Sequence, residues 1–183
     1  MRFVTRTHNW VVIAIGAIVC AAAASPAFAQ SEPRLSVTGA YVFLQQQTAG
    51  QLDPPKYPFG WLATAAGRLG GGRWSAVGEF GISYKSNDVN EQQLLTGVLG
   101  GARVALSRSK RVTVFAQGLA GLERFSEPGL VESGIAIQPG GGLDIHVSSR
   151  VFIRAQGDYR WSQANDATFH AYRIVAGVGY ALR

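Results

Sequence analysis

Apolar and polar residues alternate with a period of two over long stretches of this 183-residue chain. In the segment WSAVGEFGISYK, from Trp74 to Lys85, one set of alternate residues is Trp, Ala, Gly, Phe, Ile and Tyr, and the other is Ser, Val, Glu, Gly, Ser and Lys. An extended strand places every second residue on the same face. No amphipathic helical pattern occurs after residue 30. The chain is therefore expected to be all-β.

The alternation predicts eight strands, and each is long for a globular protein. Globular strands usually have about five or six residues, whereas a tilted strand that crosses a membrane needs about 9 to 11. An even number of long antiparallel strands predicts an eight-stranded up-and-down transmembrane β-barrel. The expected strands span residues 34–46, 59–69, 73–85, 93–106, 111–124, 133–147, 150–161 and 170–182.

The expected connections alternate between tight turns and longer loops. Outer-membrane barrels have short turns on the periplasmic side and longer loops on the outer side. The sequence therefore predicts that both ends of the barrel domain lie on the periplasmic side. Tight turns are expected at 70–72, 107–110 and 148–149, and longer loops at 47–58, 86–92, 125–132 and 162–169.

The N-terminal segment has the pattern of a secretory signal peptide. Two arginines precede an apolar run, Val11 to Ala24, which is shorter than the about 20 residues of a membrane-spanning helix. The small-x-small sequence Ala27–Ala29 then predicts cleavage before Gln30. We expect residues 1–29 to be a signal peptide and residues 30–183 to form one outer-membrane barrel domain.

Composition argues against several classes of function. Cys20 is the only cysteine and lies in the expected signal peptide, so no disulfide, thiol nucleophile or thiolate metal ligand is expected. Arg2 and Arg6 account for two of the formal +6 charges, which leaves about +4 on the exported chain. This mild charge does not indicate nucleic-acid binding. No cofactor is indicated.

Aromatic residues gather toward the expected long-loop ends of the outward faces. Tyrosine and tryptophan favour the interface between membrane and water. The pattern predicts an outer aromatic girdle, with a thinner second girdle at Trp74 and Tyr180. Its expected members are Tyr41, Phe43, Phe59, Trp61, Tyr84, Tyr159, Trp161 and Tyr172.

The stretch QPGGGLDIH, Gln138 to His146, resembles a ligand loop at first sight. A phosphate-binding glycine loop requires a following helix, and none is indicated here. Alternation instead makes this stretch the sixth strand, with glycines that leave room inside a narrow barrel. Pro139 cannot donate a ladder hydrogen bond, so a local bulge or distortion is expected there.

The inward faces collect ionisable residues. Buried charges without partners are costly, so these side chains should pair across the lumen. Eight strands enclose an interior that side chains can fill. We therefore interpret the set as a salt-bridged plug, with an ion path as the alternative. The set comprises Glu79, Arg103, Glu123, Asp144, His146, Arg154, Asp158, Arg160 and Arg173.

The two ends of the barrel differ in charge. The expected long loops are somewhat acidic, whereas basic residues gather on the turn side. The basic residues could contact headgroups of the inner leaflet, or could serve solubility alone. They are Arg68, Arg73, Arg108, Lys110, Arg111, Arg150 and Arg183.

Two stretches resemble the small outer-membrane β-barrel family, which includes the OmpA-type transmembrane domain and the outer membrane protein beta-barrel domain. PGGGLDIHVSSRVFIRAQGDYRW is similar to its penultimate hairpin, and RIVAGVGYALR is similar to its C-terminal assembly signal, with Gly177, Tyr180 and Leu182 at the glycine, aromatic and hydrophobic positions. The resemblance implies residence in the cell outer membrane and contact with its lipids and assembly machinery. No stretch resembles the peptidoglycan-binding domain of larger OmpA-type proteins.

Three functions are compatible with such a barrel. The first is a non-enzymatic integral outer-membrane protein with a structural or surface-contact role. The second is a lipid-modifying barrel enzyme, for which Ser162, Asp166 and His170 are the available nucleophile, acid and base. The third is a soluble periplasmic barrel that holds a ligand in the lipocalin manner, which would require an apolar interior. The polar inward faces favour the first.

Overall fold

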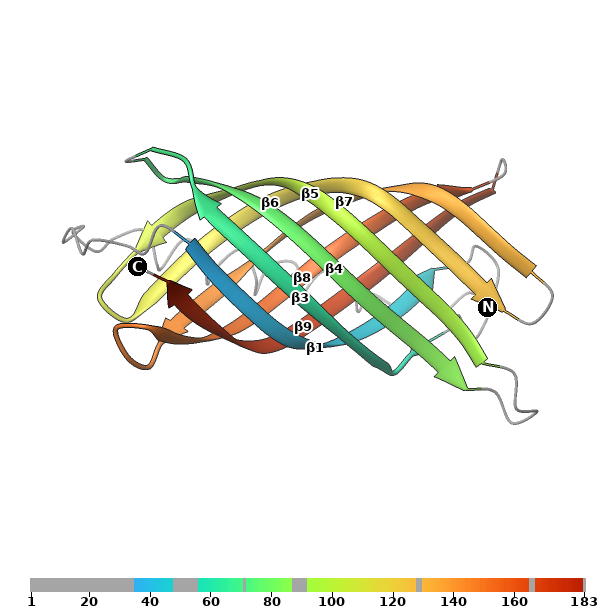
Figure 1. Cartoon of the computed structure of the whole chain (residues 1–183), viewed down its shortest axis with the longest axis horizontal. Coiled ribbons are helices and arrows are strands. Elements are labelled where there is room, and N and C mark those ends of the chain that lie inside the picture. Colours follow the sequence, from blue (N-terminus) through green and yellow to red (C-terminus); the bar gives the residue numbers. More distant parts are fainter. Residues whose placement is uncertain are drawn as a thin grey trace, which may run out of the picture.

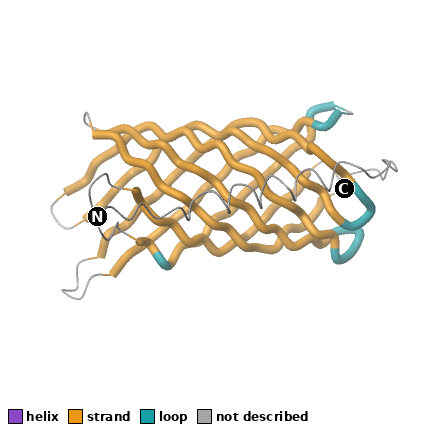
Figure 2. The backbone as a smooth tube through the Cα atoms, turned by 180° about the vertical axis from the view of Figure 1, so that it is seen from behind, coloured by secondary structure: helices purple, strands orange, loops and turns teal. Residues whose placement is uncertain are grey.

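The computed structural model describes residues 35–47, 56–70, 72–86, 92–127, 130–164 and 167–182. The expected signal peptide and its cleavage site lie outside these residues. The described chain consists of strands joined by short links, as Figures 1 and 2 show. The strands are β1 (Leu35–Gln47), β2 (Lys56–Tyr57), β3 (Phe59–Arg68), β4 (Trp74–Ser86), β5 (Gln92–Arg108), β6 (Val112–Glu127), β7 (Leu130–His146), β8 (Val151–Ala164) and β9 (Ala167–Leu182).

The sheet closes on itself. Each strand from β3 to β9 pairs antiparallel with its neighbour in sequence, and β1 pairs with both β3 and β9. The β1–β9 ladder runs from Leu35 opposite Leu182 to Gln47 opposite His170, the full length of β1. The tilted strands form an elongated cylinder. The predicted eight-stranded up-and-down barrel is confirmed.

The short strand β2 continues the line of β3 along β1. Strand β1 pairs with β3 as far as Tyr41 opposite Trp61, and then with β2 from Leu44 opposite Tyr57. The register therefore shifts by one residue around Pro58, which has no N–H to donate. Sequence alternation predicted a loop over 47–58. That prediction was wrong at residues 56–57, which form strand β2.

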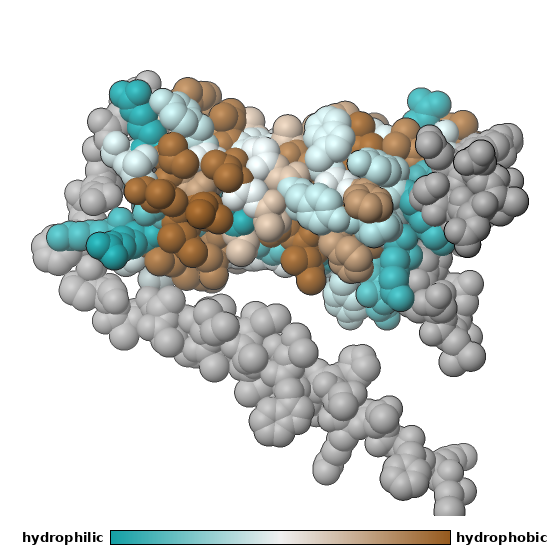
Figure 3. All heavy atoms as spheres, turned by 90° about the horizontal axis from the view of Figure 1, so that it is seen from below, coloured by the Kyte–Doolittle hydropathy of each residue, from teal (hydrophilic) through white to brown (hydrophobic). Residues whose placement is uncertain are grey.

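The wall of the barrel has an apolar outside. Outward residues alternate with buried inward ones, and the outward set includes Leu122, Ile174 and Val98, which are 67%, 65% and 58% exposed. Figure 3 shows hydrophobic side chains on this wall and more hydrophilic ones toward the two ends. No helix in the described part of the chain is long and apolar enough to cross a membrane.

Two of the expected long loops are mostly strand. Strand β6 continues to Glu127 and β7 begins at Leu130, where a loop over 125–132 was expected. Strands β8 and β9 likewise leave only residues 165–166 between them, where a loop over 162–169 was expected. The ladders continue beyond the apolar segments because backbone hydrogen bonds do not need apolar side chains.

The tight turns lie where alternation placed them. They connect β3 to β4, β5 to β6 and β7 to β8. Gly70, in the first turn, has a φ of 61°, a left-handed conformation that glycine adopts without steric cost. At the second turn the Ser109 hydroxyl donates to the Val112 carbonyl, 3.1 Å away, and accepts from the Val112 N–H.

Pro139 interrupts one ladder without shifting it. Ile137 pairs with Trp161 and Gly140 with Asp158, so the β7–β8 register is the same on both sides of the proline. Residues 138 and 139 have no partners in that ladder but keep partners on β6. The expected distortion is therefore a gap in pairing, and the expected bulge is absent. A bulge occurs instead in β5, between Ala105 and Ser107.

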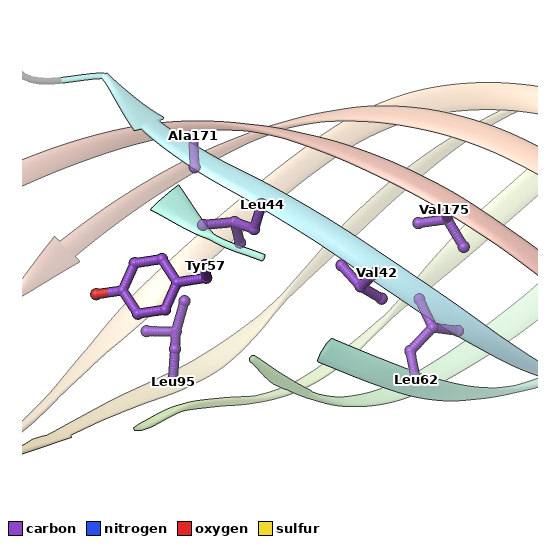
Figure 4. Close-up of a cluster of buried hydrophobic side chains, with 7 residues drawn as sticks. All are labelled: Val42, Leu44, Tyr57, Leu62, Leu95, Ala171 and Val175. Atoms are coloured by element: carbon purple, nitrogen blue, oxygen red, sulfur yellow. The ribbon is translucent and has the colours of Figure 1, made fainter. Parts of the chain in front are cut away.

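An apolar cluster fills part of the interior on the side of β1, β3 and β9. Figure 4 shows its side chains converging, with the ring of Tyr57 from β2 beside Leu44 and Leu95. Tyr57 is only 1% exposed, whereas Phe59, two residues later, is 54% exposed. The register shift at Pro58 therefore turns Tyr57 into the barrel. The cluster comprises Val42, Leu44, Tyr57, Leu62, Leu95, Ala171 and Val175.

Replacing the two aromatic residues that flank Pro58 should distinguish their faces. Tyr57→Ala removes a buried ring and should lower the free energy of unfolding by about 3–5 kcal/mol. Phe59→Ala removes an exposed ring and should lower it by less than about 1 kcal/mol. Urea titration of the refolded protein, followed by tryptophan fluorescence, measures both. Equal losses would contradict the register shift.

Candidate functional site

The ionisable side chains of the inward faces meet in the middle of the barrel. Strands β4, β6, β8 and β9 supply them, because alternate residues of each strand point inward. Glu79, Glu123, Asp158, Arg160 and Arg173 are all at most 6% exposed.

Arg173 of β9 lies at the centre of this cluster. Its Nη1 and Nη2 atoms donate to the two carboxylate oxygens of Glu79 at 2.7 and 3.0 Å. Its Nε and Nη2 atoms also donate to Asp158 Oδ2 at 3.0 and 2.7 Å. One guanidinium thus joins carboxylates from β4 and β8, and charge-assisted bonds of this two-pronged kind are the stronger ones.

Arg160 of β8 holds the neighbouring group of side chains. Its Nη1 donates to Glu123 Oε1 at 2.8 Å, and its Nε and Nη2 donate to Gln138 Oε1 at 2.8 and 2.6 Å. Nη2 also lies 3.8 Å from Glu79 Oε1. The Ser162 hydroxyl donates to the second oxygen of Glu123. Arg160 therefore connects the Glu79 and Glu123 carboxylates.

A separate ion pair lies nearer the tight turns. Arg154 Nε and Nη2 donate to the two oxygens of Asp144 at 2.7 and 2.8 Å. Arg103 donates instead to the neutral side chain of Gln117, at 3.1 and 2.6 Å. Gln117 Nε2 lies 3.4 Å from Asp158 Oδ1, which joins this region to the central cluster.

His146 lies at the edge of the network. Its Nε2 is 3.3 Å from the hydroxyl of Thr113, and its ring lies against that of Phe152 with centroids 5.8 Å apart. Within the described residues it takes part in no ion pair. The other residues of the expected lumen set all make side-chain hydrogen bonds within the barrel.

Three glutamines that the sequence analysis did not assign to the network also point into the barrel. Gln117 joins Arg103 to Asp158, and Gln138 joins Arg160 to Glu79. Gln156, also buried, donates to both oxygens of Asp158. An amide offers both donors and acceptors, so it can satisfy a carboxylate and a guanidinium together. An inward-facing glutamine between inward-facing charged residues was the sequence signal that could have predicted this role.

The glycine-rich stretch of β7 gives these side chains room. A Cβ atom at Gly140 would overlap the Asp158 carboxylate, and one at Gly142 would meet the β8 backbone. Strand β8 follows directly after the turn, so the stretch does not open a helix. The glycines accommodate the network and do not form a phosphate loop.

Most of the expected girdle residues are exposed. Tyr41, Trp61, Tyr84 and Tyr172 are 44–54% exposed on the outer wall, and Tyr159 packs against Tyr172 with ring centroids 5.3 Å apart. Phe43, Tyr159 and Trp161 are partly buried. Trp74 and Tyr180, the expected second girdle, are 54% and 40% exposed.

The residues considered for lipid chemistry have other partners. The Ser162 hydroxyl donates to Glu123, and His170 Nδ1 lies 2.5 Å from the hydroxyl of Tyr159. No hydrogen bond joins Ser162 to His170 in the described part of the chain, and Asp166 lies outside it. A nucleophile and a base need such a bond. This geometry does not assemble a catalytic group.

A cavity of about 340 Å³ opens at the loop end of the interior. Leu95, Phe125 and Phe169 contribute apolar surface to its lining, and Glu123 and Arg160 contribute polar surface. Its size lies at the lower end of the range for small-molecule sites. No group of three or more possible metal ligands occurs among the described residues.

Removing the central guanidinium should destabilise the barrel strongly. Arg173→Met leaves the carboxylates of Glu79 and Asp158 buried without their main partner, so the free energy of unfolding should fall by about 3–5 kcal/mol. Urea titration in detergent measures this loss. The double variant Glu79→Gln with Arg173→Met should lose less than the sum of the single changes.

Arg124→Met provides the matched control for this experiment. Arg124 is an exposed arginine on β6, so its loss should change the free energy of unfolding by less than about 0.5 kcal/mol. A loss at Arg173 no larger than the loss at Arg124 would contradict a stabilising role for the central cluster.

Comparison with known proteins identifies the fold. No family model matches the chain, and no curated protein matches it in sequence. Among solved structures, Neisserial surface protein A has a TM-score of 0.68 at 14% identity, over 84% of this chain and 100% of that one. Ail of Yersinia pestis gives 0.57 at 20% identity, over 81% and 98%. The N-terminal β-barrel domain of Pseudomonas aeruginosa OprF gives 0.52 at 11% identity, over 82% and 98%.

All three are outer-membrane barrels, and the match covers nearly the whole of each. At these identities the likeness concerns the fold. The resemblance indicated by the sequence is confirmed at that level: the chain has the fold of the small eight-stranded outer-membrane β-barrels.

Proposed function

We propose that this protein is an integral outer-membrane barrel with a non-enzymatic structural or surface-contact role. The observation that carries the proposal is the distribution of side chains between the two faces of the wall. Large apolar residues point outward, whereas the buried arginines, glutamates and aspartates point inward and pair. A water-soluble barrel would have the opposite arrangement.

Two sequence patterns support the proposed route to the membrane. The expected signal peptide, residues 1–29, would direct export and then be cleaved, and the outer-membrane assembly machinery would recognise the last strand. Tyr180 and Leu182 point outward near the end of β9, 40% and 39% exposed, and Gly177 packs against Ala40 of β1. These three residues are the proposed assembly signal.

The aromatic residues mark the proposed membrane boundaries. The exposed rings of Trp61, Tyr84 and Tyr172 lie toward the loop ends of their strands, with Tyr41 opposite Trp61. Trp74 and Tyr180 lie toward the turn ends. Rings of this kind favour the headgroup region. The apolar wall between the two sets would contact lipid.

The proposed lumen is closed by its own side chains. Arg160 and Arg173 link carboxylates from β4, β6 and β8 across the interior. This arrangement favours a structural plug over an ion path, because an eight-stranded interior is only wide enough for side chains. The same polar interior argues against a lipocalin-like ligand site.

Gel migration of the refolded chain tests membrane residence. Residues 30–183, refolded in detergent micelles, should migrate differently with and without boiling, because a closed barrel resists unfolding by detergent. After transfer to liposomes, protease should cleave only connections and leave the strands protected. Absence of the shift, with full solubility after detergent removal, would instead indicate a soluble barrel.

Ala116→Arg tests which face meets lipid. Ala116 lies on the outward face of β6 near the middle of the apolar wall, opposite Val104 and Gly141. An arginine there should lower the free energy of unfolding in bilayers by about 2–4 kcal/mol. The control Ser126→Arg, near the loop end of β6, should cost only about 0–1 kcal/mol. Equal costs would contradict the proposed membrane position.

A further inference from the structure

The turn end of the barrel interior contains a small, strongly basic cavity. Its volume is about 90 Å³, which suits a small anion and not a nucleotide or a sugar chain. Five arginines line it together with a single aspartate. They are Arg68, Arg73, Arg103, Arg108, Arg154 and Asp144.

A β-bulge brings Arg108 into this cavity. Ala105 pairs with Phe115, but Ser107 pairs with Val114 and Arg108 with Thr113, so β5 carries one extra residue at Leu106. Strict alternation along β5 would place Arg108 on the outer face, with Val104 and Leu106. The extra residue turns it to the inward side, where Thr113 and His146 also line the cavity. Bulges often redirect a side chain in this way.

The one aspartate of the lining is engaged by Arg154, and Arg103 has a neutral partner instead. Both oxygens of Asp144 accept hydrogen bonds from Arg154. Arg103 is 7% exposed, and its side chain contacts the neutral Gln117 and the ring of Phe115, 4.2 Å from Cζ to the centroid. No carboxylate pairs with Arg103 within the described residues. Arg103 is therefore a buried guanidinium without a carboxylate partner among the described residues, in a cavity lined by four further arginines.

We propose that this cavity binds a phosphate-type oxyanion, either free inorganic phosphate or the phosphate of a lipid headgroup. Guanidinium groups bind such oxygens through paired, charge-assisted hydrogen bonds. The hydroxyls of Ser75 and Thr113 also line the cavity and can donate to an anion. Arg73 is exposed at the end of the barrel, whereas Arg103 is buried, so the cavity leads inward from the turn-end surface.

Calorimetric titration with inorganic phosphate tests the site directly. The refolded barrel is kept in a maltoside detergent without phosphate groups, and its β-structure is checked by far-ultraviolet circular dichroism. We expect saturable binding of one phosphate per chain, with a dissociation constant below about 10 mM. Absence of saturable binding, together with absence of binding to phosphatidylglycerol in mixed micelles, would overturn the proposal.

Three variants separate this site from the general basic charge. Arg103→Gln and Arg108→Gln should each weaken phosphate binding by about tenfold or more, since each removes charge-assisted hydrogen bonds. Arg124→Gln removes the same charge from an exposed position on β6 outside the cavity and should leave binding unchanged. If Arg103→Gln fails to refold, Arg108→Gln and Arg73→Gln carry the test. Equal weakening by Arg124→Gln would overturn the proposal.

A competition experiment distinguishes the two sources of phosphate. Phosphatidylglycerol should displace bound inorganic phosphate if the cavity reaches a lipid headgroup, whereas diacylglycerol, which has no phosphate, should not. If neither lipid displaces it, the ligand is the free anion. Either result upholds the site. Both measurements use the folded barrel in detergent, so they do not depend on the test of membrane residence.

Discussion

Closure of the sheet is the constraint on which the rest of the structure depends. All of β1 pairs with β9, so the described sheet has no long open edge. In apolar surroundings each unpaired backbone N–H or C=O group costs several kcal/mol, and a closed barrel is the only β-structure that pairs them all. Closure also forces every second side chain into a narrow interior. The alternation in the sequence therefore determines what the interior contains, and here it contains charge.

The paired charges provide contacts that the ladders cannot provide. Arg173 and Glu79 are 94 residues apart, on β9 and β4, which are not neighbours in the sheet. A register slip of one residue on either strand would turn its charged side chain outward and leave the partner buried alone. The central cluster thus penalises incorrect registers more heavily than apolar packing would, because apolar side chains tolerate substitution and sliding better than unpaired charges do.

The sequence was sufficient to predict the eight strands, their order and the inward position of each lumen charge, because these follow from period-two alternation. It did not predict which charges pair. Alternation specifies the face of a residue, whereas pairing depends on its height and direction within the barrel, which strand tilt and stagger determine. Alternation also failed where the register shifts. Tyr57 and Arg108 point inward because one extra residue separates each of them from the regular part of its strand, and no hydrophobic pattern records such an insertion. At Pro139 the missing N–H left a gap in pairing without a bulge.

The two register shifts give the ends of the interior opposite chemistry. Near the loop end, the shift at Pro58 inserts the ring of Tyr57 among aliphatic side chains. Near the turn end, the shift at Leu106 adds the guanidinium of Arg108 to a region where Arg103 and Arg154 already approach the ring of Phe115, 4.2 and 5.0 Å from its centroid. Stacking on an aromatic face offsets part of the cost of a buried cation. That cost is also lower near an end of the barrel, where water can approach, than in the middle. At the centre three carboxylates share two guanidiniums, whereas the arginines of the turn-end cavity lie where an anion from outside can reach them.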